Sequence, residues 1–357
     1  MANDNNSVSS INAETVNYKI DTKKIEKIFE NDVWRDLKET HITAVEKPSL
    51  TVLGGQPGAG KSRLGYIISE SKGDNHIDIN GDDFRKYHPN FKEINEKYGI
   101  DSAKHTASFS ADITKLALDK SREEKLNVVI EGTFRVAETP IKTLEEFKNK
   151  GYETNVMIAT TPSDVSWTST LERYAKMSQS GSIPRFTPKK SHNIVVDNLA
   201  VNADKVLDSG YVDNMQVHSR DEKLYDSSES SGKPSEAINN ELHRGLTANE
   251  FNQVMNNYQS IEHLAVKDES LGVDADKMHS EKMEFLERNV LDNTKEVNKY
   301  KVIEKVEELL VTTGVAGEEL KGKLEKVHNM LFNNELGNQK KLEQTVKPVE
   351  LDNDLER

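Results

Sequence analysis

The sequence predicts an α/β fold in which a parallel sheet is flanked by helices, followed by a C-terminal all-α domain. Residues 50–53 form a short apolar run that leads into a glycine-rich loop and then a helical pattern. Helical stretches alternate with further strand-like runs at 76–80, 127–133, 152–160 and 215–219. After these strands, the composition changes to Ser, Gly and charged residues, which marks the start of a separate helical region.

The glycine-rich loop identifies a P-loop. Gly55 to Ser62 matches G-x-x-x-x-G-K-[ST] at every required position, between a predicted strand and a predicted helix. Its glycines let the backbone bend tightly, so that consecutive N–H groups can face a polyphosphate. Lys61 would reach the β and γ oxygens, and the Ser62 hydroxyl would bind Mg²⁺. A plain glycine-rich turn would not need all of these positions.

Composition sets the outer limits. The chain has 357 residues, which favours two domains, and 31% of them are charged. No apolar run approaches the roughly 20 residues that span a bilayer, and the polar start Met1 to Asn5 lacks a signal-peptide core, so we expect a cytoplasmic protein without a membrane partner. The absence of cysteine excludes disulfides and thiolate chemistry. A net charge of −13 makes nucleic acid an unlikely partner but leaves small anions in a basic cleft.

The predicted domain organisation has five parts. They are a disordered tail at 1–20, the P-loop domain at 21–225, a linker at 226–240, a helical domain at 241–335 and a second disordered tail at 336–357. Within the helical domain, Thr247 and Glu250 fit a capping box at the start of the first helix. Apolar stripes predict further helices near 278–290, 302–310 and 320–331. These stripes are more typical of a bundle core than of ligand sites.

Two neighbouring acids follow the second predicted strand. In open parallel sheets the chemistry collects at the carboxyl ends of the strands, so Asp82 falls beside the P-loop. A kinase needs an acceptor that orients the attacking hydroxyl and takes its proton, and Asp82 is our candidate for this base. Asp83 is its rival. Alternatively, Gly81-Asp82-Asp83 only turns the chain and caps the next helix.

The third predicted strand ends in another acid, Glu131. It could hold Mg²⁺ through water, hydrogen-bond the hydroxyls of an acceptor, or simply end the strand. Thr133 and Arg135 follow in a loop where alternate side chains can point into the same cleft, and an arginine there suits a phosphorylated ligand.

Two arginines lie after the fourth predicted strand. Arg173 belongs to a predicted helix, and Arg185 ends the small-residue segment 178–185, which is typical of a mobile lid. Both are candidates for balancing charge on the transferring phosphoryl group, although an arginine taken alone is more often a surface residue.

Together these motifs resemble the bacterial zeta toxin family. The resemblance covers about residues 22–225 in the same order and spacing, and is carried by five segments: Gly55 to Ser62, Asn80 to Pro89, Ile130 to Arg135, Glu172 to Tyr174 and Arg185 to Pro188. It implies ATP-dependent phosphorylation of the 3′-hydroxyl of UDP-N-acetylglucosamine. It also implies an antitoxin partner, which in known members blocks the ATP site with a helix.

The resemblance assigns roles position by position. Asp82 matches the family's catalytic base, which decides between the two acids, and Arg173 and Arg185 match the arginines that neutralise the transferring phosphate. Lys61 and Ser62 match the phosphate-binding lysine and the Mg²⁺-binding hydroxyl. Glu131, Thr133 and Arg135 match positions that contact the nucleotide sugar. The implied ATP-binding residues are Gly55, Gln56, Pro57, Gly58, Ala59, Gly60, Lys61, Ser62 and Arg63.

One position departs from the family pattern. By ungapped spacing from Glu131, Lys115 stands where founding members carry a sugar-binding glutamate. A lysine there inverts the local charge, so Lys115 is a candidate substrate contact that would favour a different acceptor.

The sequence therefore predicts an ATP- and Mg²⁺-dependent kinase of a nucleotide sugar. The alternatives are a kinase of another hydroxyl, such as a nucleotide, dinucleotide, antibiotic or polynucleotide end, and a nonenzymatic module gated by nucleotide. The C-terminal helices could inhibit the kinase from within the chain, bind a separate antitoxin or other protein, or serve delivery. Action in the protein's own cell and in another cell both stay open.

Overall fold

The central sheet confirms the predicted α/β fold. The computed structural model describes residues 18–180, 183–268 and 271–291. In these residues, the strand order is β2-β3-β1-β4-β5-β6. Five strands are parallel: β1 (Ser49–Gly55), β2 (Ile77–Ile79), β3 (Val128–Glu131), β4 (Glu153–Ala159) and β5 (Asn214–His218). The edge strand β6 (Lys223–Asp226), which sequence reasoning missed, runs antiparallel to β5.

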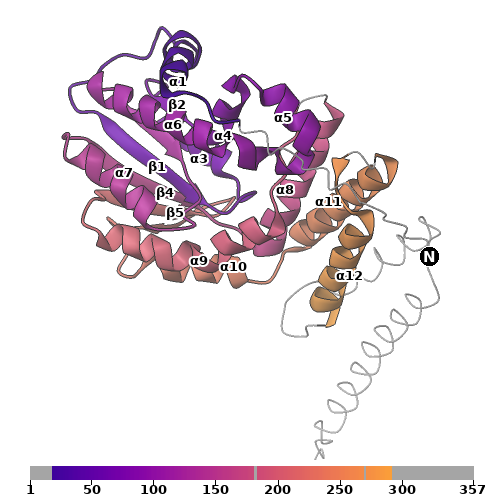
Figure 1. The fold of residues 1–357 in the computed structure, drawn as a ribbon. Coiled ribbons are helices and arrows are strands. Elements are labelled where there is room, and N and C mark those ends of the chain that lie inside the picture. Colours follow the sequence, from indigo (N-terminus) through magenta and orange to yellow (C-terminus); the bar gives the residue numbers. More distant parts are fainter. Residues whose placement is uncertain (1–17, 181–182, 269–270, 292–357) are drawn as a thin grey trace, which may run out of the picture. The chain divides into compact units, whose positions relative to one another are not determined.

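Helices lie on both sides of the strands (Figure 1). Two long connections flank the site: α3 (Lys61–Lys72) follows β1, and α6 (Ser102–Glu123) precedes β3. The short elements between β2 and α6 are α4 (Gly81–Phe84), η2 (Arg85–Tyr87), α5 (Phe91–Tyr98) and η3 (Gly99–Asp101). The remaining connections are α7 (Glu138–Lys148), α8 (Ser163–Gln179) and α9 (Lys189–Asp208).

The two faces of the sheet bury different clusters because successive strand residues point to opposite sides. Leu50 and Val52 of β1 join a large cluster with side chains of α6, α7 and α9. Leu53 points the other way, where it packs with Leu64 and Ile68 of α3. The strand that leads into the P-loop is therefore held from both faces, which gives the loop a rigid base.

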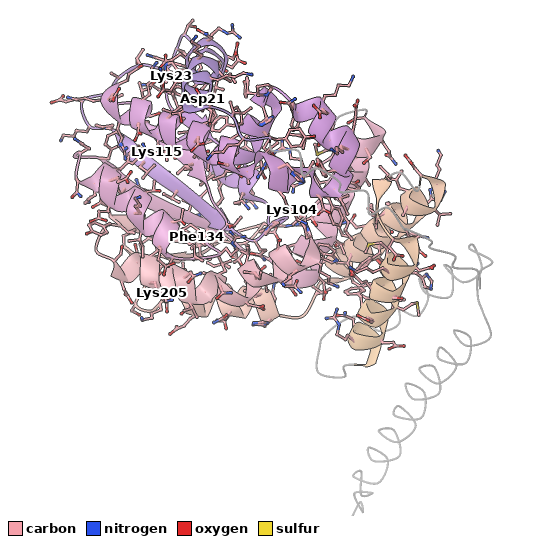
Figure 2. The ribbon with its side chains drawn as sticks, in the orientation of Figure 1. Asp21, Lys23, Lys104, Lys115, Phe134 and Lys205 are labelled. Atoms are coloured by element: carbon pink, nitrogen blue, oxygen red, sulfur yellow. The ribbon has the colours of Figure 1, made fainter. Side chains whose placement is uncertain are left out.

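The described chain begins before the predicted end of the N-terminal tail. Residues 1–17 lie outside the described part, but Tyr18 is buried and donates its hydroxyl to Glu93 Oε1 at 2.9 Å. The first helices are α1 (Thr22–Ile28), the π-helical turn η1 (Phe29–Val33) and α2 (Trp34–Leu37). Asp21 caps α1 by accepting from the backbone N–H of Lys23 at 3.0 Å (Figure 2).

The predicted linker at 226–240 is wrong over most of its length. Its serine run forms a turn around Asp226, which accepts from the backbone N–H and the hydroxyl of Ser228. Helix α10 (Pro234–His243) follows at once, and its Ile238 and Leu242 are buried in the same core as α9. The P-loop domain therefore extends past residue 225, because it needs α10 to cover that face.

The described residues divide into two compact units, 18–244 with 257–275, and 245–256 with 276–291. In the second unit, the capping box is confirmed, since Glu250 N donates to Thr247 Oγ1 at 3.2 Å at the start of α11 (Ala248–Lys267). Helix α12 (Ala275–Leu291) matches the predicted helix near 278–290, and Phe285 packs its ring against Phe251. The helices predicted beyond 291 lie outside the described residues. No described helix is long and apolar enough to cross a membrane.

Candidate active site

The P-loop backbone has the conformation that its sequence motif predicts. Gly55 and Gly58 have φ of +133° and +80°, values that L side chains rarely adopt. Space forbids a side chain as well, since a Cβ on Gly58 would lie 2.0 Å from the carbonyl oxygen of Ser166. A Cβ on Gly55 would lie 2.2 Å from that of Ala159. The loop is therefore packed tightly between β4 and α8.

The nine predicted ATP-binding residues separate into two groups. Pro57, Gly58, Gly60, Lys61 and Ser62 line a large cavity. The others do not. Gly55, Gln56 and Ala59 are buried and do not line the cavity. The side-chain amide of Gln56 donates to the carbonyl of Thr161 at 2.7 Å. Arg63 turns away and donates to the carbonyl of Asp221 at 3.0 Å.

A second arginine, which sequence reasoning missed, supports the loop from outside. Arg220 donates through Nη2 to the carbonyl of Gly58 at 2.8 Å and to Ser169 Oγ at 2.9 Å. It lies in the turn after β5, and no local sequence signal connects it with a loop some 160 residues earlier. A carbonyl held on the outer side helps to keep the loop's N–H groups directed inward.

Asp82 and Asp83 stand in the first turn of α4, where β2 ends. Asn80 caps this helix, since its Oδ1 accepts from the backbone N–H of Asp82 at 3.0 Å. The acids were predicted to be possible caps, but the preceding asparagine has that role. Neither carboxylate is used as the cap, and both acids line the cavity.

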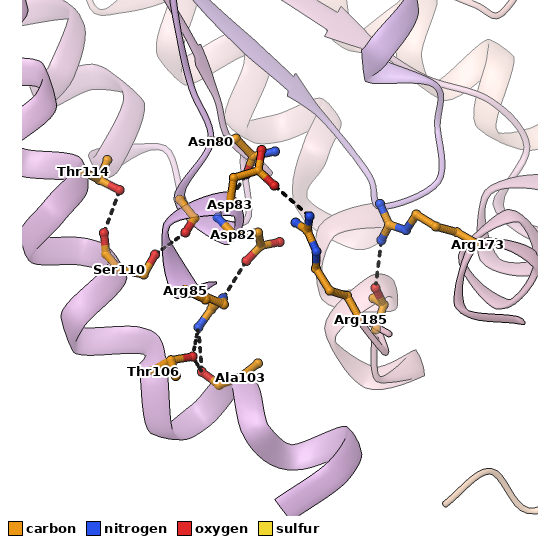
Figure 3. Close-up of polar contacts among 12 residues, drawn as sticks. Asn80, Asp82, Asp83, Arg85, Ala103, Thr106, Ser110, Thr114, Arg173 and Arg185 are labelled. Atoms are coloured by element: carbon orange, nitrogen blue, oxygen red, sulfur yellow. Dashed lines mark hydrogen bonds and ion pairs between the residues drawn. The ribbon is translucent and has the colours of Figure 1, made fainter. Parts of the chain in front are cut away.

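Each acid is paired with a different arginine (Figure 3). Asp82 accepts from Arg85 Nε at 2.9 Å, and Asp83 accepts from Arg185 Nη2 at 2.7 Å. Arg185 therefore lies on the same side of the cavity as the candidate base. The neighbouring Arg173 contacts Thr187 at 3.5 Å. Part of the predicted lid, Gly181 and Ser182, lies outside the described residues.

The loop after β3 also faces the cavity, whose lining includes Glu131, Thr133 and Arg135. Phe134 between them is buried and has a φ of +56°, which is uncommon for a residue with a side chain. Asn202 of α9 holds this conformation by donating to the Phe134 carbonyl at 2.8 Å. The ring packs so closely on Gly54 that a Cβ there would lie 2.6 Å from it. The loop is thus fixed against β1.

Charge is concentrated around the P-loop lysine. Lys61 Nζ donates to the carbonyl of Gly55 at 3.1 Å. Burial lowers the pKa of Lys61, while the negative charges of Glu131 and Asp82 oppose that shift. Burial raises the pKa of Glu131, and Lys61 opposes it. Burial and the nearby Arg185 lower the pKa of Arg173. These groups interact because they share one cavity, of about 1050 Å³.

Comparison with known proteins identifies the family. A family model described as Zeta toxin matches residues 31–230. Toxin zeta of Enterococcus hirae is 34% identical over 265 residues, which are 73% of this chain and 92% of that protein. The chain belongs to the zeta toxin family.

Other toxins of this family show a comparable similarity to this chain. Toxin zeta of Streptococcus pyogenes is 36% identical over 231 residues, covering 63% of this chain and 80% of that protein. A solved structure from work on the PezAT chromosomal toxin-antitoxin system of Streptococcus pneumoniae superposes with a TM-score of 0.61 at 26% identity. The match covers 69% of this chain and 98% of that one. The family resemblance predicted from the motifs is confirmed.

The structure does not place Lys115 at the cavity of this zeta toxin, where a substrate contact is predicted. Lys115 is absent from the cavity lining; its side chain is 76% exposed and pairs with Asp119 on the surface of α6 (Figure 2). Cavity-lining positions on α6 include Thr106 and Ser110, and Thr114 continues that face towards Gly81. One residue further on, the helix has turned by about 100°, which points Lys115 elsewhere. The departure therefore does not change the charge of this cavity.

The zeta toxin site also fits a magnesium ion that arrives with phosphates. No described group of three or more His, Asp or Glu could hold a metal by itself. Mg²⁺ usually keeps several waters and takes only one or two protein ligands besides substrate phosphates. The exposed Ser62 hydroxyl at the end of the P-loop, in a cavity that Asp82 and Glu131 also line, suits such an ion.

Proposed function

We propose that this zeta toxin is an ATP-dependent phosphotransferase whose acceptor is a hydroxyl of a nucleotide sugar, with the 3′-hydroxyl of UDP-N-acetylglucosamine as the first candidate. The observation that carries the proposal is the convergence of Lys61, Asp82, Glu131 and two arginines on one cavity. A P-loop holds the donor triphosphate, and a carboxylate at the end of β2 can accept a proton from an alcohol.

The proposed reaction is an in-line displacement. The acceptor oxygen bonds to the γ-phosphorus as the bond to the β–γ bridging oxygen breaks, and ADP leaves. Asp82 orients the hydroxyl and takes its proton. Lys61, Arg173 and Arg185 balance the negative charge that spreads over the phosphoryl oxygens. When bound, Mg²⁺ supplies further charge neutralisation, with the Ser62 hydroxyl and the phosphates as ligands.

The acceptor side of the cavity favours a ligand that carries both hydroxyls and phosphate. Glu131 can accept hydrogen bonds from sugar hydroxyls, and the exposed Arg135 can bind a diphosphate. A cavity of about 1050 Å³ has room for a donor and an acceptor together, since a pocket for one drug-sized ligand is about 300–1,000 Å³.

Incubation with ATP labelled at the γ-phosphate tests this function. We expect label to move to UDP-N-acetylglucosamine, and less readily to free sugars that lack the diphosphate. If the label moves instead to a nucleotide, an antibiotic or a polynucleotide end, the protein is a kinase but the proposed acceptor is wrong. If label moves to no acceptor although the nucleotide binds, the protein is a nucleotide-gated module and the proposal is wrong.

We further propose that a separate antitoxin restrains this protein, as the PezAT structure is described as a toxin-antitoxin system. The full-length chain expressed alone in a bacterial host is then expected to arrest growth, whereas the Asp82→Asn variant at the same level does not. Normal growth with the full chain, together with arrest by a chain ending at Ala275, would assign the restraint to the C-terminal helices instead.

A further inference from the structure

The two neighbouring acids of α4 differ in what holds them. Arg185, the partner of Asp83, comes from the segment after α8. Arg85, the partner of Asp82, follows it by one helical turn. Figure 3 shows that the two pairs diverge: Arg85 extends towards α6, and Arg185 reaches Asp83 from the segment after α8. Asp82 is thus held by a close neighbour in the chain, whereas Asp83 is held by the segment that follows α8.

Arg85 is itself anchored on α6. Its Nη1 donates to the carbonyl of Ala103 at 2.7 Å and to the hydroxyl of Thr106 at 2.9 Å. Its side chain is only 19% exposed, while that of Asp82 is 57% exposed. Thr106 is buried, and α6 continues into the core through Phe109. A solvent-facing carboxylate therefore receives its orientation from a guanidinium that is fixed in the fold.

Stability does not account for this pair. An ion pair whose carboxylate is more than half exposed contributes little to folding, because solvent screens it. What the pair adds is direction, since one carboxylate oxygen is held and the other is left for a ligand.

We infer that Arg85 is a positioning residue that orients Asp82 towards the acceptor hydroxyl. This inference rests on the proposed kinase function and on Asp82 as its base. Arg85 accepts no proton and needs no contact with the phosphoryl group. Its effect is geometric, and a misplacement of about 1 Å can cost roughly 100-fold in rate.

The test compares Arg85→Ala with Lys104→Ala, which removes a cation from an exposed position on α6, the helix that anchors Arg85. We expect Arg85→Ala to lower kcat for phosphoryl transfer by about 10- to 100-fold. The acceptor KM and the ATP dissociation constant should stay near those of the unmodified protein. Lys104→Ala should match the unmodified protein in all three. Arg85→Lys should recover part of kcat, because lysine can pair with Asp82 but lacks the planar fork that also reaches α6.

One further variant guards against misfolding. Thr106→Val keeps the guanidinium and its charge but removes one anchor, so a smaller fall in kcat is expected at an unchanged melting temperature. Unchanged kcat in Arg85→Ala, or a raised acceptor KM at constant kcat, would overturn the inference, since the latter means direct substrate contact. Both of these outcomes are measured relative to an unmodified protein that transfers phosphate. If the unmodified protein transfers nothing, the proposed kinase function has failed instead.

Discussion

Replacing Asp82 by Asn is expected to lower the phosphoryl transfer rate by about 10²- to 10⁴-fold while ATP binding is nearly retained. Asparagine keeps the size of the side chain but cannot take the proton of the attacking hydroxyl. The side chain lies on α4, outside the P-loop, so the nucleotide loses no contact with the loop. Single-turnover transfer from labelled ATP measures the rate, and a fluorescent ATP analogue measures binding.

Asp83→Asn is the matched control for this prediction. It changes the next residue of the same turn, its side chain is similarly exposed, and the chemical change is the same. It breaks the pair with Arg185, so we expect a smaller loss of rate than for Asp82→Asn. The reverse ranking of the two variants would make Asp83 the base and would remove the proposed role of Asp82.

Lys61→Ala is expected to damage both ATP binding and transfer. The ammonium group is the cation of the P-loop itself, held towards the cavity by the carbonyl of Gly55. Hydrogen bonds to charged groups contribute about 1.5–3 kcal/mol, so ATP affinity should fall by roughly 10- to 100-fold. Loss of one donor to the developing charge should lower the transfer rate by a further 10²- to 10³-fold, roughly. Nucleotide titration and single-turnover kinetics separate the two effects.

Lys115→Ala serves as the control for charge. It removes the same group from an exposed position that pairs only locally with Asp119 and does not line the cavity. We expect ATP affinity, acceptor KM and transfer rate to stay unchanged. A rise of the acceptor KM would mean that Lys115 reaches the substrate after all, contrary to its place on α6.

Much of the donor side can be read from the chain because its requirements are local. The P-loop needs glycines, a lysine and a hydroxyl within eight consecutive positions, and the structure has the positive φ values that this spelling requires. The strands are short apolar runs, and parallel strands collect their carboxyl ends at one edge. That rule is enough to bring Asp82 and Glu131 to the cavity beside Lys61.

The acceptor side depended more on tertiary structure. Ungapped spacing places Lys115 among the predicted substrate contacts, but a helix rotates by about 100° per residue, and in the structure Lys115 points to the surface of α6. The serine-rich segment was predicted to be a linker because of its composition. In the structure this segment leads into α10, whose Ile238 and Leu242 are buried in the core beside α9. Composition does not show this contact.

By itself, the sequence determined the fold class, the P-loop and the family, since each is written in contiguous or regularly spaced residues. Only the tertiary structure decided that Arg85 holds Asp82, that Arg185 holds Asp83 and that Arg220 supports the Gly58 carbonyl. The physical reason is that a hydrogen bond depends on distance and direction in space. Arg185 and Asp83 are 102 residues apart, and Arg220 and the Gly58 carbonyl are 162 residues apart, so these partners meet only in the folded chain.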